Sequence, residues 1–201
     1  HEGAPWICFG FEPLCPLSDV PLVGHHNVNN VLAALAICHA MGLPYAQLVA
    51  GIKTLKGLPH RCELVGVRDG VQFVNDSKGT NVGATVAALE GLADGRNVIL
   101  IAGGEGKGQA FAPLAKAASQ HAKHMVLIGC DAVRIAEVLD ATTPHTFSDA
   151  MEAAVRTATD IATSGDIVLL SPACASLDMF ADYRARGDAF TAAVRDCEEV
   201  S

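Results

Sequence analysis

The sequence predicts an α/β fold: a Rossmann-like, doubly wound and mostly parallel sheet with an antiparallel hairpin at one edge. Strand-like and helix-like segments alternate regularly after residue 80, as parallel strands joined by crossover helices do. The Asp69–Gly70 turn between two short alternating runs predicts the hairpin. Polar side chains directly follow several expected strands, at the edge where such sheets bind ligands.

The segments ahead of the hairpin differ from this alternation. Residues 6–11 predict a strand without a partner close in sequence, and the prolines after it predict an irregular stretch. Residues 26–41, rich in Ala and Leu, predict a largely buried helix, and 45–55 predict a second helix. Gly and Pro residues then indicate a linker, so we expect a domain boundary that separates 1–57 from 58–201.

From the linker onward the elements follow one another closely. Apolar runs bounded by turn residues predict strands, and the segments between them predict helices. Asn81 or Thr80 can cap the first of these helices. The expected strands are 62–68, 71–74, 97–102, 124–128, 145–147 and 166–171. The expected helices are 81–92, 110–119, 132–139, 148–163 and 186–197.

Composition narrows the function classes. The chain has 14 Lys and Arg against 22 Asp and Glu, a formal net charge of -8, and no basic cluster, which argues against a nucleic-acid surface. No apolar run approaches the roughly 18 residues of a membrane span, so we expect no membrane segment. The seven cysteines include no Cys-x-x-Cys pair, which favours a reducing cytoplasm over a disulfide framework or a zinc site.

A polar loop follows the strand over 71–74. Within five residues it carries a carboxylate, an ammonium and two hydroxyls, next to the start of a helix. These groups belong to Asp76, Ser77, Lys78 and Thr80. Free N–H groups at a helix N-terminus attract anions, so the loop suits a phosphate or a sugar phosphate. The alternative is a polar turn that only caps the helix.

A glycine-rich segment, GGEGKG at 103–108, follows the next strand. It is not a Walker A loop, because that pattern would need glycine at position 101 and Ser or Thr at 108, where the chain has Ile101 and Gly108. It is not the dinucleotide-binding fingerprint either. Lys107 is therefore either a cation aimed at a ligand or a solvated lysine.

Small residues follow the strand over 166–171. The run SPACASLD at 171–178 lets backbone and ligand approach closely, and it offers the hydroxyls of Ser171 and Ser176. Cys174 invites a nucleophile hypothesis, but no histidine partner is evident in the sequence. An inert role as a small residue is favoured for this cysteine.

Three residues outside these loops are also candidates for ligand binding. Asn27 and Asn30 lie three residues apart at the start of a helix, where their amides could bind the edge of a purine. The alternative is that one of them only caps the helix. Arg61, in the linker, is either an exposed charge or a phosphate clamp between domains.

These motifs together resemble the Mur ligase family of peptidoglycan synthesis, in particular its D-glutamate-adding branch. Five segments carry the resemblance in the family's order and span essentially the whole chain: GHHNVNNVLAAL at 24–35, LPHRCE at 58–63, NDSKGTN at 75–81, GGEGKG at 103–108 and SPACASLDMF at 171–180. The last segment points to the D-glutamate branch, and the Asp-Asn-Pro-Arg motif of the diaminopimelate-adding branch is absent. Gly79 stands where the family commonly has alanine, and Tyr183 where it often has phenylalanine.

The resemblance implies part of a three-domain enzyme. Residues 1–57 would be a helical remnant at the end of the central ATP-binding domain, and 58–201 the C-terminal Rossmann-like domain. The implied enzyme is a cytoplasmic, monomeric ligase that uses ATP and Mg²⁺ to join D-glutamate to UDP-N-acetylmuramoyl-L-alanine through an acyl phosphate. The Walker A loop and the metal ligands would lie in the missing N-terminal and central domains, so we expect the isolated 201-residue chain to be inactive.

The resemblance also assigns roles to single residues. The implied ATP contacts are Asn27, Asn30, His60, Arg61, Asp76 and Lys78. The implied D-glutamate contacts are Thr80, Lys107, Ser176, Leu177 and Tyr183. Lys107 and Arg61 would be the catalytic cations, because they would screen the repulsion between two anionic substrates. The alternative function is a non-catalytic module that binds a nucleotide or small anion, and a dehydrogenase is disfavoured by the missing glycine fingerprint.

Overall fold

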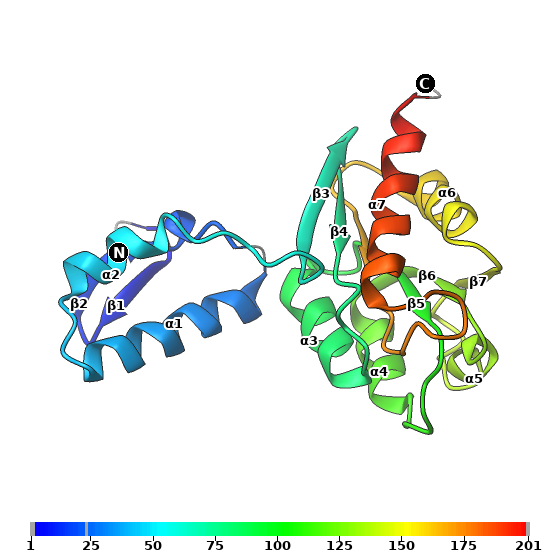
Figure 1. The fold of residues 1–201 in the computed structure, drawn as a ribbon, viewed down its shortest axis with the longest axis horizontal. Coiled ribbons are helices and arrows are strands. Elements are labelled where there is room, and N and C mark those ends of the chain that lie inside the picture. The colour runs from blue at the N-terminus through cyan, green and yellow to red at the C-terminus, as the bar shows by residue number, and fades with distance from the viewer. Residues whose placement is uncertain (1–2, 23, 200–201) are drawn as a thin grey trace. The chain divides into compact units, whose positions relative to one another are not determined.

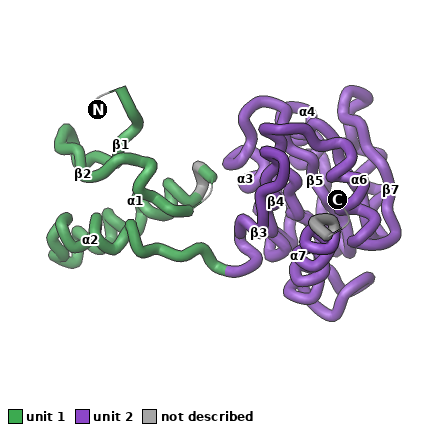
Figure 2. The backbone as a smooth tube through the Cα atoms, turned by 90° about the horizontal axis from the view of Figure 1, so that it is seen from above, with its two compact units in different colours: residues 1–58 green, residues 59–201 purple. Residues whose placement is uncertain are grey.

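The computed structural model describes residues 3–22 and 24–199. It divides the chain into two compact units, residues 1–58 and 59–201 (Figure 2), and this division lies one residue after the expected boundary. The units have separate hydrophobic cores. None of the helices in the described ranges is long and apolar enough to cross a membrane.

Unit 1 is a two-stranded hairpin packed against two helices. Its core consists of five buried side chains contributed by both strands and both helices, namely Ile7, Cys15, Val31, Leu35 and Ile52. Its elements are β1 (Trp6–Phe9), β2 (Glu12–Pro16), the short 3-10 helix η1 (Leu17–Asp19), α1 (His25–Ala40) and α2 (Tyr45–Ile52).

The strand β1 has a partner directly after it, so the expectation of an unpaired strand followed by irregular chain is wrong. Gly10, at φ 58°, turns the chain, and Ile7 of β1 pairs with Cys15 of β2. The two prolines of β2 are tolerated because each strand of a two-stranded ribbon has one edge that needs no ladder hydrogen bonds. The proline-based prediction of irregular chain overlooked this geometry.

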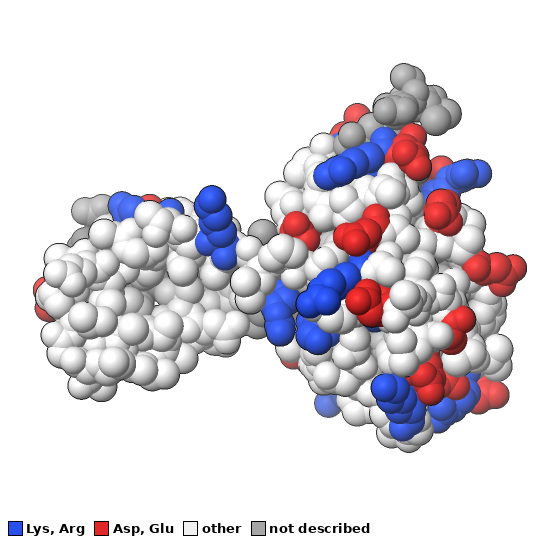
Figure 3. Space-filling view, in the orientation of Figure 1, with Lys and Arg blue, Asp and Glu red and all other residues white. Residues whose placement is uncertain are grey.

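Helix α1 forms where it was expected, but it is not largely buried. Val31 and Leu35 are its only buried residues among those whose side chains are described, while Leu32 is 41% and Ile37 63% exposed. The visible face of unit 1 also carries few charged side chains (Figure 3). A high content of Ala and Leu favours helix formation because little rotamer freedom is lost, but burial depends on what covers the helix.

Unit 2 is a six-stranded sheet between two layers of helices (Figure 1). The strand order is β3-β4-β8-β5-β6-β7, and only the edge strand β3 is antiparallel. The predicted fold class is thereby confirmed. The strands are β3 (Glu63–Arg68), β4 (Val71–Asn75), β5 (Val98–Gly103), β6 (Ala122–Ile128), β7 (His145–Ser148) and β8 (Ile167–Leu170). The helices are α3 (Val82–Leu92), α4 (Ala112–His121), α5 (Ala132–Ala136), α6 (Met151–Ile161) and α7 (Tyr183–Glu199).

The central strands supply side chains to a core on each face of the sheet. Leu100 of β5 and Leu169 of β8 pack in the core shared with α3, α4 and α5. Ile99 and Val168, their neighbours in sequence, pack in the core shared with α6 and α7. Successive side chains of a strand point to opposite faces, and strands covered on both faces can be continuously apolar, as β5 and β8 are.

Helix α7 begins at Tyr183, three residues earlier than the expected start at 186. The carboxylate of Asp182 accepts hydrogen bonds from the N–H groups of Arg184 and Ala185, both at 2.8 Å. An acidic side chain in this position caps the first turn of a helix. Arg186 consequently lies within that first turn, and it is buried there.

Strand β8 comes last in sequence but lies between β4 and β5. The helix that follows β5, α4, packs on one face of the sheet, whereas α7, which follows β8, packs on the other. Doubly wound sheets bind ligands where consecutive connections leave toward opposite faces. This topology directs attention to the carboxyl ends of β4, β8 and β5.

Candidate functional site

Three loops leave the carboxyl ends of three neighbouring parallel strands. The loops are residues 76–81 after β4, 171–182 after β8 and 104–111 after β5, and β8 is hydrogen-bonded to both other strands. The sequence places the expected anion-binding side chains in these loops. Because β4, β8 and β5 are adjacent and parallel, the three loops lie side by side at the carboxyl edge of the sheet.

Main-chain hydrogen bonds hold the three loops together. The Ala173 N–H donates to the Gly79 carbonyl at 2.9 Å, which joins the loops after β8 and β4. Glu105 and Ala175 exchange two hydrogen bonds, at 3.0 and 2.9 Å, which join the loops after β5 and β8. The main chain therefore connects the loop after β8 to each of the other two loops.

Strained backbone is concentrated in and beside these loops. The described non-glycine residues with positive φ are His60, Cys62, Asp69, Lys107 and Ala173. Asp69 belongs to the β3–β4 hairpin turn, and the other four lie in the candidate site or in the chain segment next to it. Such conformations cost about 1–3 kcal/mol each and persist where the surroundings enforce them, often at functional sites.

Asp76 is buried, and both of its carboxylate oxygens have a partner. Oδ2 accepts from the Ser171 hydroxyl at 2.7 Å, and Oδ1 accepts from the Cys62 N–H at 3.3 Å. Burial raises the pKa of the Asp76 carboxyl above its ordinary value, while the two hydrogen bonds act in the opposite direction. Ser171 was named in the sequence only as a hydroxyl of the small-residue run, and its pairing with Asp76 was not foreseen.

The ring of Tyr183 contacts residues that were expected to bind a different ligand from its own. The Lys78 ammonium lies 4.2 Å from the centre of the Tyr183 ring, and the Arg184 guanidinium lies 5.2 Å from it. The His60 ring meets Tyr183 edge-on, with 5.8 Å between ring centres. The structure thus brings His60 and Lys78, expected at the nucleotide, against Tyr183, expected at D-glutamate.

The His60 side chain is mostly buried against α7. Its Nδ1 lies 3.3 Å from the Asn75 amide nitrogen, and its Nε2 lies 3.9 Å from the carboxylate of Asp188. The main-chain carbonyl of His60 accepts from the Lys78 N–H at 3.1 Å. This histidine therefore connects the linker to the loop after β4.

The other expected residues of unit 2 differ in accessibility. Lys107 and Arg61 are exposed, and neither forms an ion pair within the described part of the chain. Thr80 is half-buried and Ser176 is buried, whereas its neighbour Leu177 is 62% exposed. Exposed lysine and arginine side chains that form no such ion pair can bind an anion.

Asn27 and Asn30 belong to unit 1. The Asn30 amide donates to the Asn27 side-chain oxygen at 3.3 Å, so the predicted pair of amides on one helix face exists. The alternative that one of them caps the helix is wrong, because the cap residue is Gly24 and no side chain caps α1.

Arg186 is a functional candidate that the sequence did not single out. It is 1% exposed, and its guanidinium donates to the main-chain carbonyls of Ser77 at 3.1 Å and Cys174 at 3.0 Å. Burial lowers the pKa of Arg186 to about 10. An arginine near the start of an amphipathic helix normally faces solvent, so no local signal in the sequence indicates this role.

Asp131, after β6, supports the glycine-rich loop from another side. Its carboxylate accepts from the Gly106 N–H at 2.7 Å and pairs with Arg134 at 3.1 Å. The bond from Gly106 is the main reason why the pKa of Asp131 lies below its ordinary value. Cys174 is fully buried, and burial raises the pKa of its thiol to about 12, which agrees with the predicted inert role.

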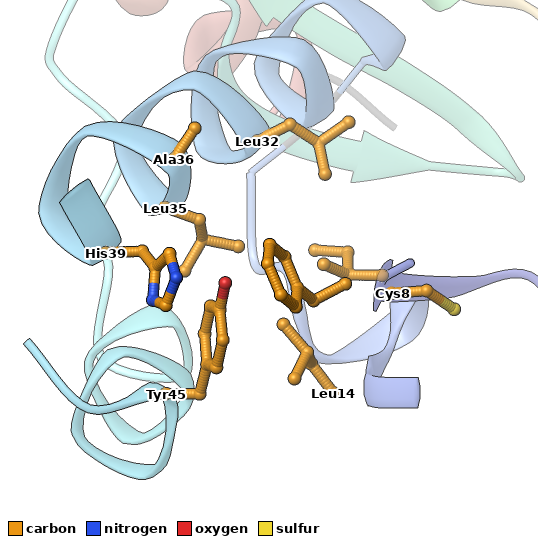
Figure 4. A pocket seen from close by; sticks show the side chains of 9 residues that line it. Cys8, Leu14, Leu32, Leu35, Ala36, His39 and Tyr45 are labelled. Carbon is orange, nitrogen blue, oxygen red and sulfur yellow. The ribbon is translucent and has the colours of Figure 1, made fainter. Parts of the chain in front are cut away.

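A separate hollow of about 220 Å³ lies in unit 1 (Figure 4). Leucine side chains from β2 and α1 line it, and the rings of His39 and Tyr45 stack there with centres 4.4 Å apart. None of the described residues that line it is Lys or Arg. This hollow therefore lacks the positive charge that would bind an anionic ligand, whereas the loops of unit 2 carry lysine side chains.

Comparison with known proteins places these loops in a family context. Residues 60–174 match the family model described as Mur ligase, glutamate ligase domain. The chain is 51% identical over 196 residues to UDP-N-acetylmuramoylalanine–D-glutamate ligase of Nitrosococcus oceani, covering 98% of the chain and 43% of that protein. The ligase of the same name from Aromatoleum aromaticum is also 51% identical, over 201 residues, with 98% and 43% covered. The chain thus spans about two fifths of the length of these relatives.

Solved structures with low sequence identity share the fold. UDP-N-acetylmuramate-alanine ligase of Thermotoga maritima superposes with a TM-score of 0.64 at 16% identity, over 88% of this chain and 39% of that one. The bifunctional folylpolyglutamate synthase/dihydrofolate synthase of Yersinia pestis gives a TM-score of 0.60 at 19% identity, over 92% and 40%. These likenesses concern the fold alone.

Proposed function

Because the chain belongs to the Mur ligase family, we propose that it is the C-terminal part of an ATP-dependent ligase that adds D-glutamate to UDP-N-acetylmuramoyl-L-alanine. The supporting observation is the joining of three loops at one sheet edge, since these loops carry Thr80, Lys107 and Ser176. Relatives of about 51% identity named as D-glutamate ligases support this choice of amino acid. Unit 1 would be the end of the ATP-binding domain, and the enzyme would act in the cytoplasm as a monomer.

The charge and polarity of each side chain determine which part of the substrate we propose that it binds. D-Glutamate has two carboxylates, and Lys107 would bind one of them while the hydroxyls of Thr80 and Ser176 donate to them. Leu177 and Tyr183 would contact its carbon chain. Binding both substrates in one site places several negative charges close together, and Lys107 and Arg61 would screen their repulsion.

The residues present fit part of an ATP site. Exposed Arg61 and half-buried Lys78 would bind phosphates, with His60 next to Arg61, and Asp76 would hold the ribose. In unit 1, Asn27 and Asn30 would contact the adenine. ATP supplies the phosphoryl group that activates a carboxylate. Among the described residues no three metal-ligating side chains gather, so Mg²⁺ ligands are proposed to lie in the upstream part of the protein.

The proposed reaction joins a carboxylate to an amine by way of an acyl phosphate, which is a mixed anhydride of the carboxylic acid and phosphoric acid. The terminal carboxylate of UDP-N-acetylmuramoyl-L-alanine receives the phosphoryl group, the D-glutamate amine attacks the acyl carbon, phosphate leaves with its oxygen, and the amine loses a proton. The residues of this chain hold the amine donor in place and form no covalent bond with it. The loop geometry supports such positioning because the cation and the hydroxyls belong to loops that are hydrogen-bonded to one another.

The test uses the full-length protein and measures ADP release with a panel of amino acids. D-Glutamate should support turnover, whereas L-alanine, diaminopimelate and D-alanyl-D-alanine should not, and preference for another member of the panel would refute the proposed substrate. No amino-acid-dependent ADP release at all would favour the alternative of a non-catalytic binding module. The isolated 201-residue chain should release no phosphate from ATP.

Lys107→Ala tests the assignment of the cation. Loss of a charge-assisted hydrogen bond is worth about 1.5–3 kcal/mol, so KM for D-glutamate should rise roughly 10- to 150-fold, while KM for ATP changes little. Lys116→Ala, which removes an exposed lysine from α4, is the control and should alter neither constant. Equal effects of Lys107→Ala on both KM values would contradict the assignment.

A further inference from the structure

We propose that Gln109 is a positioning residue that sets the spacing of the three loops in the proposed D-glutamate site. The inference rests on the proposed function and adds to it a residue outside the expected ligand contacts. Gln109 follows Lys107 by two residues and is half-buried at the end of the glycine-rich segment.

The side-chain amide of Gln109 bonds to the loop after β8 and to the start of α3, where the loop after β4 ends. Its Oε1 accepts from the Val82 N–H at 3.0 Å, at the first residue of α3. Its Nε2 donates to the Ala173 carbonyl at 2.6 Å, in the loop after β8. One planar group therefore touches the start of α3 and the loop after β8 while it is anchored in the loop after β5.

Each group that Gln109 binds is a main-chain group that requires a hydrogen-bond partner from another segment of the chain. The N–H groups in the first turn of a helix have no partner within the helix, and the Asn81 cap satisfies Ala84 rather than Val82. Ala173 has φ 60°, a conformation that must be held by its surroundings, and its N–H already donates to Gly79. An amide can accept and donate at once, which a carboxylate or an aliphatic side chain cannot do.

The three loops joined by Gln109 are those that carry the proposed D-glutamate contacts. Thr80 lies two residues before Val82, and Ser176 lies three residues after Ala173. Without the amide, the Lys107 loop keeps its backbone pairing with Ala175 but loses its tie to the start of α3. A misplacement of about 1 Å in a positioning group can cost on the order of 100-fold in rate.

The decisive measurement compares Gln109→Met with Asn97→Leu in the full-length protein. Met has nearly the shape of Gln without its polar atoms. Asn97 is a matched control, because its amide also bridges two segments, accepting from Asp94 at 2.9 Å and donating to Gly165 at 3.0 Å, at the opposite end of β5. Both variants should lose thermal stability to a similar extent.

The two variants should differ in substrate use. Gln109→Met should raise KM for D-glutamate about tenfold or more and leave KM for ATP within about twofold, since its two hydrogen bonds end close in sequence to Thr80 and Ser176, the proposed D-glutamate contacts. Asn97→Leu should change neither constant. An unchanged KM for D-glutamate in Gln109→Met, or an equal rise in Asn97→Leu, would overturn the inference.

Amide hydrogen exchange separates failure of this inference from failure of the proposed function. In the full-length protein, Gln109→Met should accelerate exchange at the Val82 amide, whose N–H donates to Gln109, and Asn97→Leu should not. A wild-type protein without D-glutamate-dependent turnover would refute the proposed function, whatever the exchange data show. Unaltered exchange at Val82 would show that Gln109 does not hold the loops, whatever the kinetics show.

Discussion

Replacing Gly104 by alanine should disrupt the loop that carries Lys107. Gly104 has φ 123°, and a Cβ at this position would lie 2.2 Å from the Ala175 carbonyl oxygen. That contact is between main-chain atoms and a fixed Cβ, so the loops themselves must move apart. Gly108, in the same loop, also has positive φ, at 78°, but a Cβ there would meet nothing within 4 Å. Gly108→Ala is therefore the matched control.

The difference between the two variants can be worked out from the structure. Alanine in a conformation that favours glycine costs roughly 1–3 kcal/mol, and this applies at both positions. At Gly104 the displacement also breaks the two Glu105–Ala175 hydrogen bonds, each worth about 1 kcal/mol. We expect Gly104→Ala to lower the free energy of unfolding by roughly 3–5 kcal/mol and Gly108→Ala by roughly 1–3 kcal/mol, so the loss should be about 2 kcal/mol greater at Gly104.

Urea unfolding of the 201-residue chain measures this difference. Far-UV circular dichroism follows the helices and strands of both units, and the fluorescence of Trp6, the single tryptophan, follows unit 1. A transition seen by circular dichroism but not by fluorescence is therefore that of unit 2. The unit 2 transition should shift to lower urea for Gly104→Ala, and the unit 1 transition should not move. Equal losses of unfolding free energy for the two variants, or a larger loss for Gly108→Ala, would refute the reasoning. That reasoning is that the loop after β8 lies too close to position 104 for any residue but glycine.

Two further predictions concern carboxylates of the site. Burial raises the folded-state pKa of Asp76, so its charge costs stability above that pKa and the cost disappears as the pH falls toward 3.8. Asp76→Asn should remove this pH dependence of stability, and in the full-length protein it should also weaken ATP binding. An unchanged pH dependence together with unchanged ATP affinity would refute the assignment. The pKa of Asp131 is lowered by the Gly106 N–H, so its contribution is present above the ordinary value of 3.8 and is lost as the pH falls through the lower folded-state value. The Gly106 amide proton resonance should titrate with a midpoint below 3.8, and a midpoint above it would contradict this cause.

Local sequence determined most of the secondary structure and the candidate loops. The Asp69–Gly70 hairpin, the Asn81 cap of α3 and the apolar run of β5 depend on interactions within a few residues, so patterns along the chain predict them. The polar loop after β4, the glycine-rich loop and the small-residue loop were identified for the same reason. The pairing of β1, the exposure of α1 and the start of α7 were predicted wrongly, because each depends on a neighbour that the local pattern does not specify.

Only the tertiary structure decided how these loops combine. The insertion of β8 between β4 and β5 depends on the path that the crossover connection takes over the sheet. The residues of β8 do not indicate which strands lie beside it. The burial of Arg186 against the carbonyls of two loops, and the reach of Gln109 to Val82 and Ala173, follow from that insertion. Hydrogen bonds between residues far apart in sequence depend on distances that the fold alone creates, and so the groups that hold the site together were visible only in three dimensions.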